Sequence, residues 1–252
     1  MIHTIQADFY RLFRSKGFWI TEFILFILML MGATIGATGH LMSVDTTPPE
    51  TELPSKGWDG IQALINASSQ GSNLVFLCIV LACLVLGVDL IGKLYKNNLT
   101  VGVSRTEFFL AKAFVLASIA LLQVIISLVI AFIPATILNG FGTMPEDFIG
   151  NLLITISLQF LCLLAWLSIV SFILYVSHSY IAVFIGYLVS SILLSMPVLI
   201  FPSIKILPYL SLQFFYAMTA NSESIFYTLI VTLAVIVIFN LSGLAVFKKK
   251  SL

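Results

Sequence analysis

Long apolar runs dominate this sequence and limit what it can fold into. They occupy six stretches, at about residues 18–42, 73–92, 113–138, 148–176, 181–200 and 225–247. A helix needs about 20 apolar residues to cross the hydrocarbon core of a bilayer. Only 9% of the 252 residues are charged, against about 25% in soluble domains, so a soluble globule is excluded. We predict an all-α membrane protein with six transmembrane helices in one domain, residues 1–252.

The first 16 residues are predicted to form an amphipathic helix that lies in the membrane interface. Its apolar stripe holds Ile2, Ile5, Phe9, Leu12 and Phe13, and its opposite side holds Asp8, Arg11, Arg14 and Ser15. The alternative is a short frayed leader whose arginines only anchor the next span. The apolar run that follows exceeds the 7 to 15 residues of a signal peptide, so we expect a retained span.

The positions of the cations predict the orientation in the membrane. Six spans place both termini on one side, and that side collects 10 of the 12 Lys and Arg residues, in segments 11–16, 93–112 and 248–250. Only Lys56 and Lys205 fall on the other side. Cytoplasmic loops are enriched in Lys and Arg, so we expect both termini to be cytoplasmic and the protein to lie in the cell membrane.

The segment before the last span is expected to be irregular. It is too apolar for a solvent-exposed loop. Pro197, Pro202 and Pro208 would interrupt a straight helix there, because proline removes a backbone hydrogen bond. Irregular backbone at membrane depth survives only where protein shields it. We therefore expect a re-entrant or interfacial pair of short helices.

The polar segment between the second and third spans is predicted to form a compact bend, called the elbow here (residues 93–107). Asn97, Asn98 and Gly102 are expected to interrupt the helix, and Ser104 with Glu107 forms a capping box that opens the next one. A structured bend suits a membrane subunit that receives force from a soluble partner. The alternative is an ordinary capped turn with anchoring cations.

Catalytic and metal-binding motifs are not recognisable in the sequence. The string from Gly87 to Lys93 begins like a phosphate-binding loop, but Leu94 follows where a Ser or Thr would hold magnesium. The remaining candidates are too scattered for a metal or redox pair: His3, His40, His178, Cys78, Cys83 and Cys162. We predict no catalytic, cofactor or metal site and no enzymatic activity, and the net charge of +1 gives no reason to expect a nucleic-acid partner.

Two acidic residues inside the apolar runs are candidates for function or for local pairing. Glu22 and Asp89 are expected to reach the interface or to pair with a nearby Lys or Arg, for Asp89 with Lys93 one turn later. Gln123 and Gln159 are expected to bond across helices. A secondary transporter or channel acting alone is the alternative function. It would require inverted repeats and a polar or charged pair near the midplane, but we find no convincing repeat, and the midplane polar groups are scattered and uncharged.

The opening ADFYRLFRSKGFWI, the elbow GKLYKNNLTVGVSRTEFFLAK, the broken apolar segment before the sixth span and the ending FKKKSL form one pattern. Together they resemble the permease subunit of an ABC-2 type transporter. The chain is most similar to the short permeases of Gram-positive bacteria that confer immunity to lantibiotics or export amphipathic peptides.

The resemblance implies a division of labour. The N-terminal helix lies on the cytoplasmic leaflet, the elbow docks on a separate ABC ATPase that binds the ATP, and re-entrant helices precede span six. Two permeases, identical or sister chains, pair around a pathway for a lipophilic or amphipathic substrate such as an antimicrobial peptide. Arg105 and Glu107 are expected to transmit the movement, with Leu99, Val101 and Val103 as apolar contacts and Lys93 and Lys96 beside them.

Overall fold

The computed structural model describes residues 2–36, 57–69, 71–100, 102–201, 204–212 and 222–249, and their regular structure is entirely helical. Six helices in these ranges are long and apolar enough to cross a membrane. They are α2 (Lys16–Ile35), a second span built from α4 (Gly71–Ala82), η1 (Cys83–Gly87) and α5 (Val88–Ile91), α7 (Arg105–Asn139), α8 (Phe148–Ser177), α9 (Tyr180–Ile200) and α10 (Ser222–Lys249). This confirms the predicted class and number of apolar helices.

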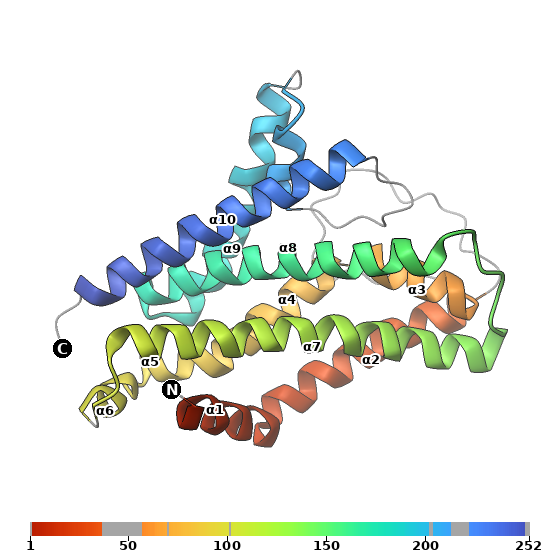
Figure 1. Ribbon diagram of the computed structural model, residues 1–252. Coiled ribbons are helices and arrows are strands. Elements are labelled where there is room, and N and C mark those ends of the chain that lie inside the picture. The colour runs from red at the N-terminus through yellow and green to blue at the C-terminus, as the bar shows by residue number, and fades with distance from the viewer. Residues whose placement is uncertain are drawn as a thin grey trace.

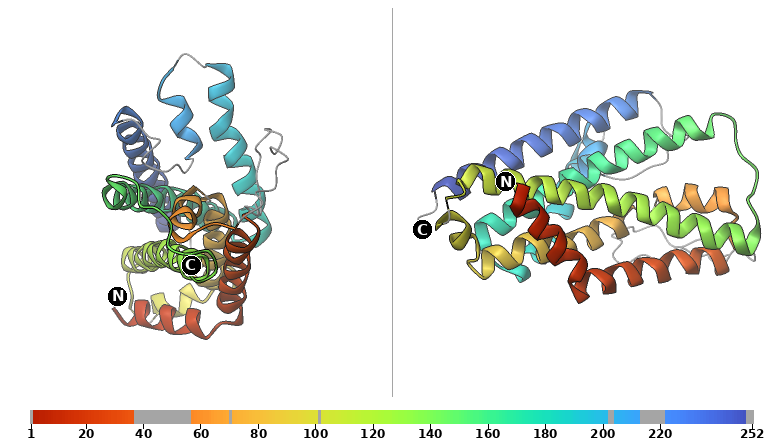
Figure 2. Two further views of the ribbon diagram at one scale, coloured as in Figure 1. Left: turned by 90° about the vertical axis from the view of Figure 1, so that its right-hand side faces the viewer. Right: turned by 60° about the horizontal axis from the view of Figure 1, so that its bottom comes forward.

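The spans form an elongated bundle in which α7 and α8 run side by side and α10 crosses α8 (Figure 1). The short helix α3 (Gly60–Ser69) packs against α7 at one end. At the opposite end lie α6 (Tyr95–Thr100), the start of α1 (Ile2–Arg14) and the end of α10. We call this the elbow end. Helix α1 lies across the bundle rather than along it (Figure 2).

The second span and α8 are the most buried of the six spans, and α9 is the least buried. After a tight turn at His178, whose φ is 50°, α9 contacts α8 and then leans away from the bundle (Figures 1 and 2). The 3₁₀ turn η2 (Leu207–Ser211) returns along α9 and contacts α10. Pro197 lies inside α9 and Pro208 inside η2, whereas Pro202 falls outside the described residues.

The capping box is confirmed, and with it the start of α7. The Glu107 backbone N–H donates to Ser104 Oγ over 3.2 Å, and the Ser104 N–H donates to Glu107 Oε2 over 3.0 Å. Helix α7 thus begins at Arg105, before the apolar span predicted from about residue 113, so Arg105 and Lys112 lie on the spanning helix itself. Strong capping and continuous helix-forming residues carry the helix beyond its apolar run.

The prediction that Asn97 and Asn98 interrupt the helix is wrong, because both lie inside α6. The break comes earlier, at the turn after Gly92, where Lys93 has a left-handed φ of 56°. Gly102, with φ 101°, ends the bend as expected. At the other end of the first span, Gly36 (φ 68°) terminates α2 at Ile35, and residues 37–56, with the predicted end of the span at 42, lie outside the described chain.

Candidate functional site

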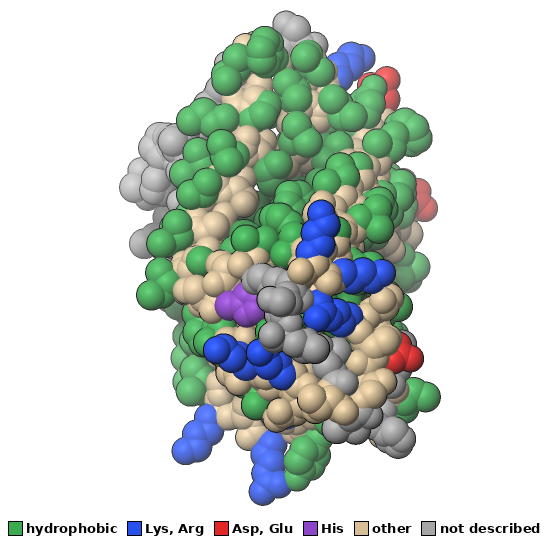
Figure 3. Space-filling view, turned by 90° about the vertical axis from the view of Figure 1, so that its left-hand side faces the viewer, with side chains coloured by type: hydrophobic (Ala, Val, Ile, Leu, Met, Phe, Trp, Pro, Cys, Tyr) green, Lys and Arg blue, Asp and Glu red, His purple; other side chains and the backbone are tan. Residues whose placement is uncertain are grey.

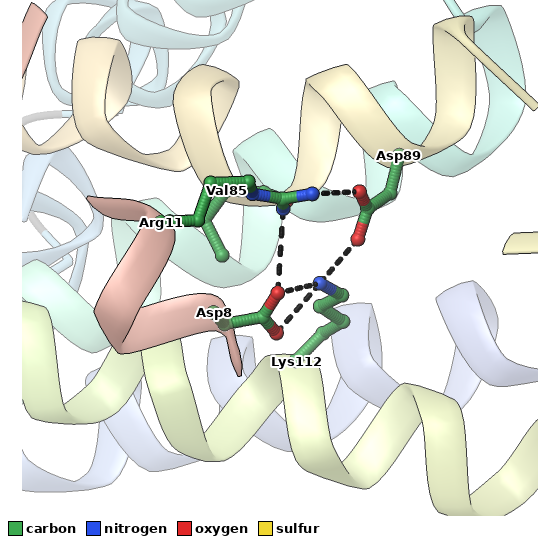
Figure 4. A network of polar contacts seen from close by, with 5 residues as sticks. All are labelled: Asp8, Arg11, Val85, Asp89 and Lys112. Carbon is green, nitrogen blue, oxygen red and sulfur yellow. Dashed lines mark hydrogen bonds and ion pairs between the residues drawn. The ribbon is translucent and has the colours of Figure 1, made fainter. Parts of the chain in front are cut away.

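Four charged side chains from three elements meet at the elbow end of the bundle (Figure 4). Lys112 Nζ on α7 donates to Asp8 Oδ1 and Oδ2 on α1 over 2.7 and 2.6 Å, and also pairs with Asp89 Oδ2 on α5. Arg11 on α1 donates to Asp89 Oδ1 over 2.6 Å and to Asp8 Oδ1 over 3.3 Å. We call Asp8, Arg11, Asp89 and Lys112 the charge network. It joins α1 to both helices that flank the elbow.

The charge network is buried. Asp8, Asp89 and Lys112 are 4%, 3% and 1% exposed, and only Arg11 reaches the surface. The two positive and two negative groups balance formally, which a buried site requires because an uncompensated charge there costs several kcal/mol. Burial raises the pKa of the Asp8 carboxyl, and Lys112 beside it opposes that rise. Ionisable groups buried within a spanning bundle are functional-site candidates.

A π-helical turn in the second span supplies an acceptor for this network. In η1 the Val88 N–H bonds to Cys83 O, five residues back, instead of to the fourth residue as in an α-helix. The Val85 carbonyl in this turn accepts a hydrogen bond from Arg11 Nη2 over 3.0 Å. Single π turns are frequent at functional sites, and here the turn helps to fix the guanidinium.

The predicted Asp89–Lys93 pair is wrong, and among the described residues Glu22 forms a hydrogen bond with Gln123 but no ion pair. Lys93 is exposed in the left-handed turn after α5, so it does not continue the helix that carries Asp89. Asp89 pairs instead with Arg11 and Lys112, which are distant in sequence. Sequence periodicity placed Arg11 on the outer face of α1. One sequence feature could have indicated the charge network: Lys112 lies at the edge of an apolar run, where a buried lysine requires a negatively charged partner.

The elbow is anchored to the end of α10. Arg105 Nη1 donates to the carbonyls of Phe247 and Lys248 over 3.2 and 2.8 Å. Because basic groups stabilise the exposed carbonyls of a helix C-terminus, Arg105 ties the start of α7 to the last turn of α10. The predicted transmission residue therefore makes an internal contact in this structure.

Aromatic rings beneath the elbow extend this anchor to α8. Measured between ring centroids, Tyr95 lies 5.9 Å from Phe247 and 6.2 Å from His178. Phe108 stacks on Phe247 at 5.6 Å. Tyr175 lies 5.2 Å from both Phe109 and Phe247. We call these six the aromatic cluster: Tyr95, Phe108, Phe109, Tyr175, His178 and Phe247. His178 Nδ1 is also 3.2 Å from Leu90 O on α5. The elbow thus contacts the ends of α8 and α10, and His178 links it on to α5.

The outer surface of the elbow end is basic (Figure 3). Lys93, Lys248 and Lys249 are exposed, and Lys96 is half-buried. Val103 is half-buried and Glu107 exposed, whereas Val101 and the side chain of Leu99 lie outside the described residues. The structure thus brings most of the predicted elbow residues to one end of the molecule.

The apolar stripe of α1 is divided between two surroundings. Ile5 and Phe9 pack against a buried cluster formed by Leu12 and residues of α2, the second span and α7. Ile2 and Phe13 are exposed, as is Arg14. Helix α1 is therefore held by apolar packing as well as by the charge network.

A second polar contact lies within the spans. Gln123 Nε2 on α7 donates to Glu22 Oε1 on α2, and Gln159 Nε2 donates to the Ser68 carbonyl, so the predicted cross-helix glutamine bonds are confirmed. Among the described residues, the buried Glu22 Oε2 and Gln123 Oε1 have no hydrogen-bond partner. A protonated carboxyl can donate where a carboxylate only accepts. Glu22 is therefore the candidate for proton binding inside the bundle.

Comparisons with known proteins identify no relative: none of the family models matches the chain, and no curated protein matches it either. Within the described residues, His, Cys, Asp and Glu form no group of three that could hold a metal ion. The site can therefore be interpreted from its geometry alone. That geometry is a mechanical junction in which α1, α5, α7, α8 and α10 meet around the elbow.

Proposed function

We propose that this chain is the membrane-spanning permease subunit of an ATP-binding cassette exporter of the ABC-2 type. In this proposal it crosses a bacterial cell membrane six times with both termini in the cytoplasm. A separate ATPase subunit binds and hydrolyses ATP, and a second copy or a sister permease completes the pathway. The proposal is supported by the sequence resemblance, the six apolar helices and the exposed cations at the elbow end.

The observation that carries the proposal is the connection of the elbow to its surroundings. Its flanking helices bear Asp89 and Lys112, which both bind α1, and Arg105 binds the end of α10. A force applied to the elbow would act on all of these helices at once, because buried ion pairs and close packing transmit displacement. A soluble motor that closes on ATP is a source of such a force.

The remaining parts fit the same arrangement. Helix α1 would lie in the cytoplasmic membrane interface, with the exposed Ile2, Tyr10 and Phe13 toward lipid. The segment with Pro197 and Pro208 would be the re-entrant or interfacial element of the outer face, where η2 folds back along α9. Apart from Glu22 and the paired Asp89 and Lys112, the described spans bury no charged side chain, so the proposed substrate is lipophilic or amphipathic, such as an antimicrobial peptide.

The test is transport by the reconstituted complex. The chain is expressed with an ABC ATPase that copurifies with it, and the export of a labelled amphipathic peptide and the ATP hydrolysis are measured in liposomes. Arg105→Glu, or two glycines inserted after the open turn at Gly102, is expected to reduce export at least about tenfold while the ATPase stays active. Lys205→Glu, an exposed cation at the other end of the bundle, is the control and is expected to retain export. Full export by both elbow variants would refute the proposal.

The second candidate, a transporter acting alone, is favoured by one observation, the buried Glu22–Gln123 contact with its unsatisfied oxygens. It predicts uphill transport by liposomes that contain only this chain and an imposed proton gradient, and loss of that transport in Glu22→Gln. Uphill transport by the pure chain would replace the ATPase-driven proposal by this one.

A further inference from the structure

Between α7, α8 and α10 lies a cavity of about 430 Å³, a size within the usual range of small-molecule sites. Its lining is apolar except for Ser168, Ser171 and Asn240, and no charged residue lines it. Leu110, Val237 and Leu241 at its rim are 50%, 53% and 63% exposed. The cavity therefore opens sideways, onto the surface of the bundle that faces lipid if these helices span a membrane.

Asn240 contributes a side-chain carbonyl, Oδ1, whose hydrogen-bonding capacity a purely apolar occupant of the cavity would leave unsatisfied. Its Nδ2 donates to Ser168 Oγ and to the Ile236 carbonyl, both over 2.8 Å. Because a carbonyl only accepts, the second bond fixes which end of the amide is nitrogen. Within the described residues the Asn240 Oδ1 has no hydrogen-bond partner, and an unsatisfied carbonyl in hydrocarbon costs several kcal/mol.

The depth of the cavity places it in one half of the bundle. Asn240 precedes the end of α10 at Lys249 by about 13 Å at the rise of an α-helix, less than half of a hydrocarbon core of about 30 Å. The cavity is thus on the elbow side of the midplane. Phe109, one of its lining residues, stacks on Tyr175 of the aromatic cluster, so the cavity wall continues into the contacts that hold the elbow.

The geometry points to a binding site for an amphipathic molecule that inserts an alkyl chain or apolar side chains between α7, α8 and α10 and donates one uncharged hydrogen bond to Asn240 Oδ1. Hydroxyl and amide N–H groups meet this requirement. The acyl region of a diacyl phospholipid does not, because its ester groups only accept. A charged group is disfavoured by the apolar lining.

We infer that the exporter takes up its substrate from the inner leaflet at this site, and this role rests on the proposed function. The binding of an amphipathic molecule at the site does not depend on that function. A movement of the elbow would reach the cavity through Arg105, Phe247, Tyr175 and Phe109, which are linked by the contacts described above. The binding site would therefore change shape when the ATPase closes.

Binding is tested with the purified chain in phospholipid nanodiscs, without any ATPase. The probes are a long-chain fatty alcohol with a diazirine in its chain and the methyl ether of the same alcohol, which keeps the chain but lacks the donor. After irradiation, labelled peptides are mapped by mass spectrometry over a range of probe concentrations. The alcohol is expected to label α7, α8 and α10 saturably and to bind about fivefold more tightly than the ether.

Three variants separate the cavity from the general lipid surface. Ala117→Phe fills the cavity and is expected to abolish saturable labelling, whereas Ala234→Phe places the same ring on an exposed position of α10 outside it and is expected to leave labelling unchanged. Asn240→Leu is expected to remove the preference for the alcohol while the ether still binds. Size-exclusion profiles show which variants are folded, and Ala113→Phe replaces Ala117→Phe if the latter is not.

Equal, non-saturable labelling of all spans by both probes would overturn the site. An unlabelled amphipathic peptide is added as competitor in a last arm. Competition supports the peptide as the bound class. If saturable labelling persists in the presence of the peptide, the binding site is supported but peptide export is not. Failure of the site and failure of the proposed function are therefore distinguishable.

Discussion

Replacement of Lys112 by Met tests whether the charge network is the structural junction that the geometry indicates. Methionine keeps the length of the side chain but removes the ammonium group that contacts Asp8 twice and Asp89 once. Two carboxylates, 4% and 3% exposed, are then left with Arg11 alone and a net charge of −1. Breaking a buried pair in this way costs about 3–5 kcal/mol, which corresponds to a fall of about 10 °C in the unfolding midpoint for a chain of this size.

Thermal unfolding in detergent can be followed with a thiol-reactive dye, because Cys78, Cys83 and Cys162 are all buried and react only when the fold opens. Lys93→Met, an exposed lysine of the elbow, is the control and is expected to change stability by less than about 0.5 kcal/mol. The double variant Asp8→Asn/Lys112→Met restores neutrality around Asp89 and Arg11. It is expected to be more stable than the sum of the two single changes by about 0.5–3 kcal/mol.

The result that would refute the reasoning is a Lys112→Met protein as stable as Lys93→Met, or single changes that simply add. A pH series gives an independent check through Asp8. Burial holds the pKa of Asp8 above its ordinary value of 3.8 even beside Lys112, with Arg11 also lowering it and Asp89 raising it. Without Lys112 the rise is larger, and the folded state then binds more protons than the unfolded state. The deficit of Lys112→Met should therefore shrink as pH falls through the folded pKa of Asp8 and grow as pH rises through it.

Two further predictions concern the interior of the spans. Gly32→Ala places a methyl group 2.1 Å from the Trp58 ring and is expected to lower the free energy of unfolding by about 1–3 kcal/mol. The control is Gly150→Ala, whose added methyl group has no atom within 4 Å and is expected to be neutral or slightly stabilising. Equal unfolding midpoints for the two variants would contradict the packing around Gly32. Glu22→Gln is expected to keep the free energy of unfolding, because an amide can both donate to and accept from Gln123. Glu22→Ala is expected to lower the free energy of unfolding by about 1–3 kcal/mol, because it leaves Gln123 without this partner. An infrared band of a protonated carboxyl that disappears in Glu22→Gln would identify the proton, and its absence would show that Glu22 is ionised.

The spans and the elbow could be predicted from sequence because their signals are local. Apolar length decides where a helix can cross a bilayer, and the four residues from Ser104 to Glu107 contain the whole of a capping box. The apolar span is expected only from about residue 113, because hydropathy marks the apolar part of a helix and not its first turns. A helix continues through Arg105 and Lys112 when a cap and a buried partner support it.

The charge network could not be predicted, because its partners lie far apart in the chain. Arg11 and Asp89 are separated by 78 residues, and Lys112 and Asp8 by 104. Helical periodicity predicts the face on which a residue lies but not the helix that covers this face. The local rule therefore pairs Asp89 with Lys93, but the left-handed turn at Lys93 ends the helix, and Asp89 pairs with Arg11 and Lys112 instead.

The energetics of this network indicate why it matters to a mechanical role. Well-packed apolar residues of the same volume are often as stabilising as a buried ion pair or more so, and α1 already buries Ile5 and Phe9 against the bundle. Ion pairs differ from apolar contacts because they depend on the relative position of two specific groups. Lys112 binds carboxylates of α1 and α5 at one point, so a shift of either helix breaks a contact that water does not replace. Apolar packing also holds α1, and this junction adds a fixed point at which the position of α1 depends on the two helices that flank the elbow.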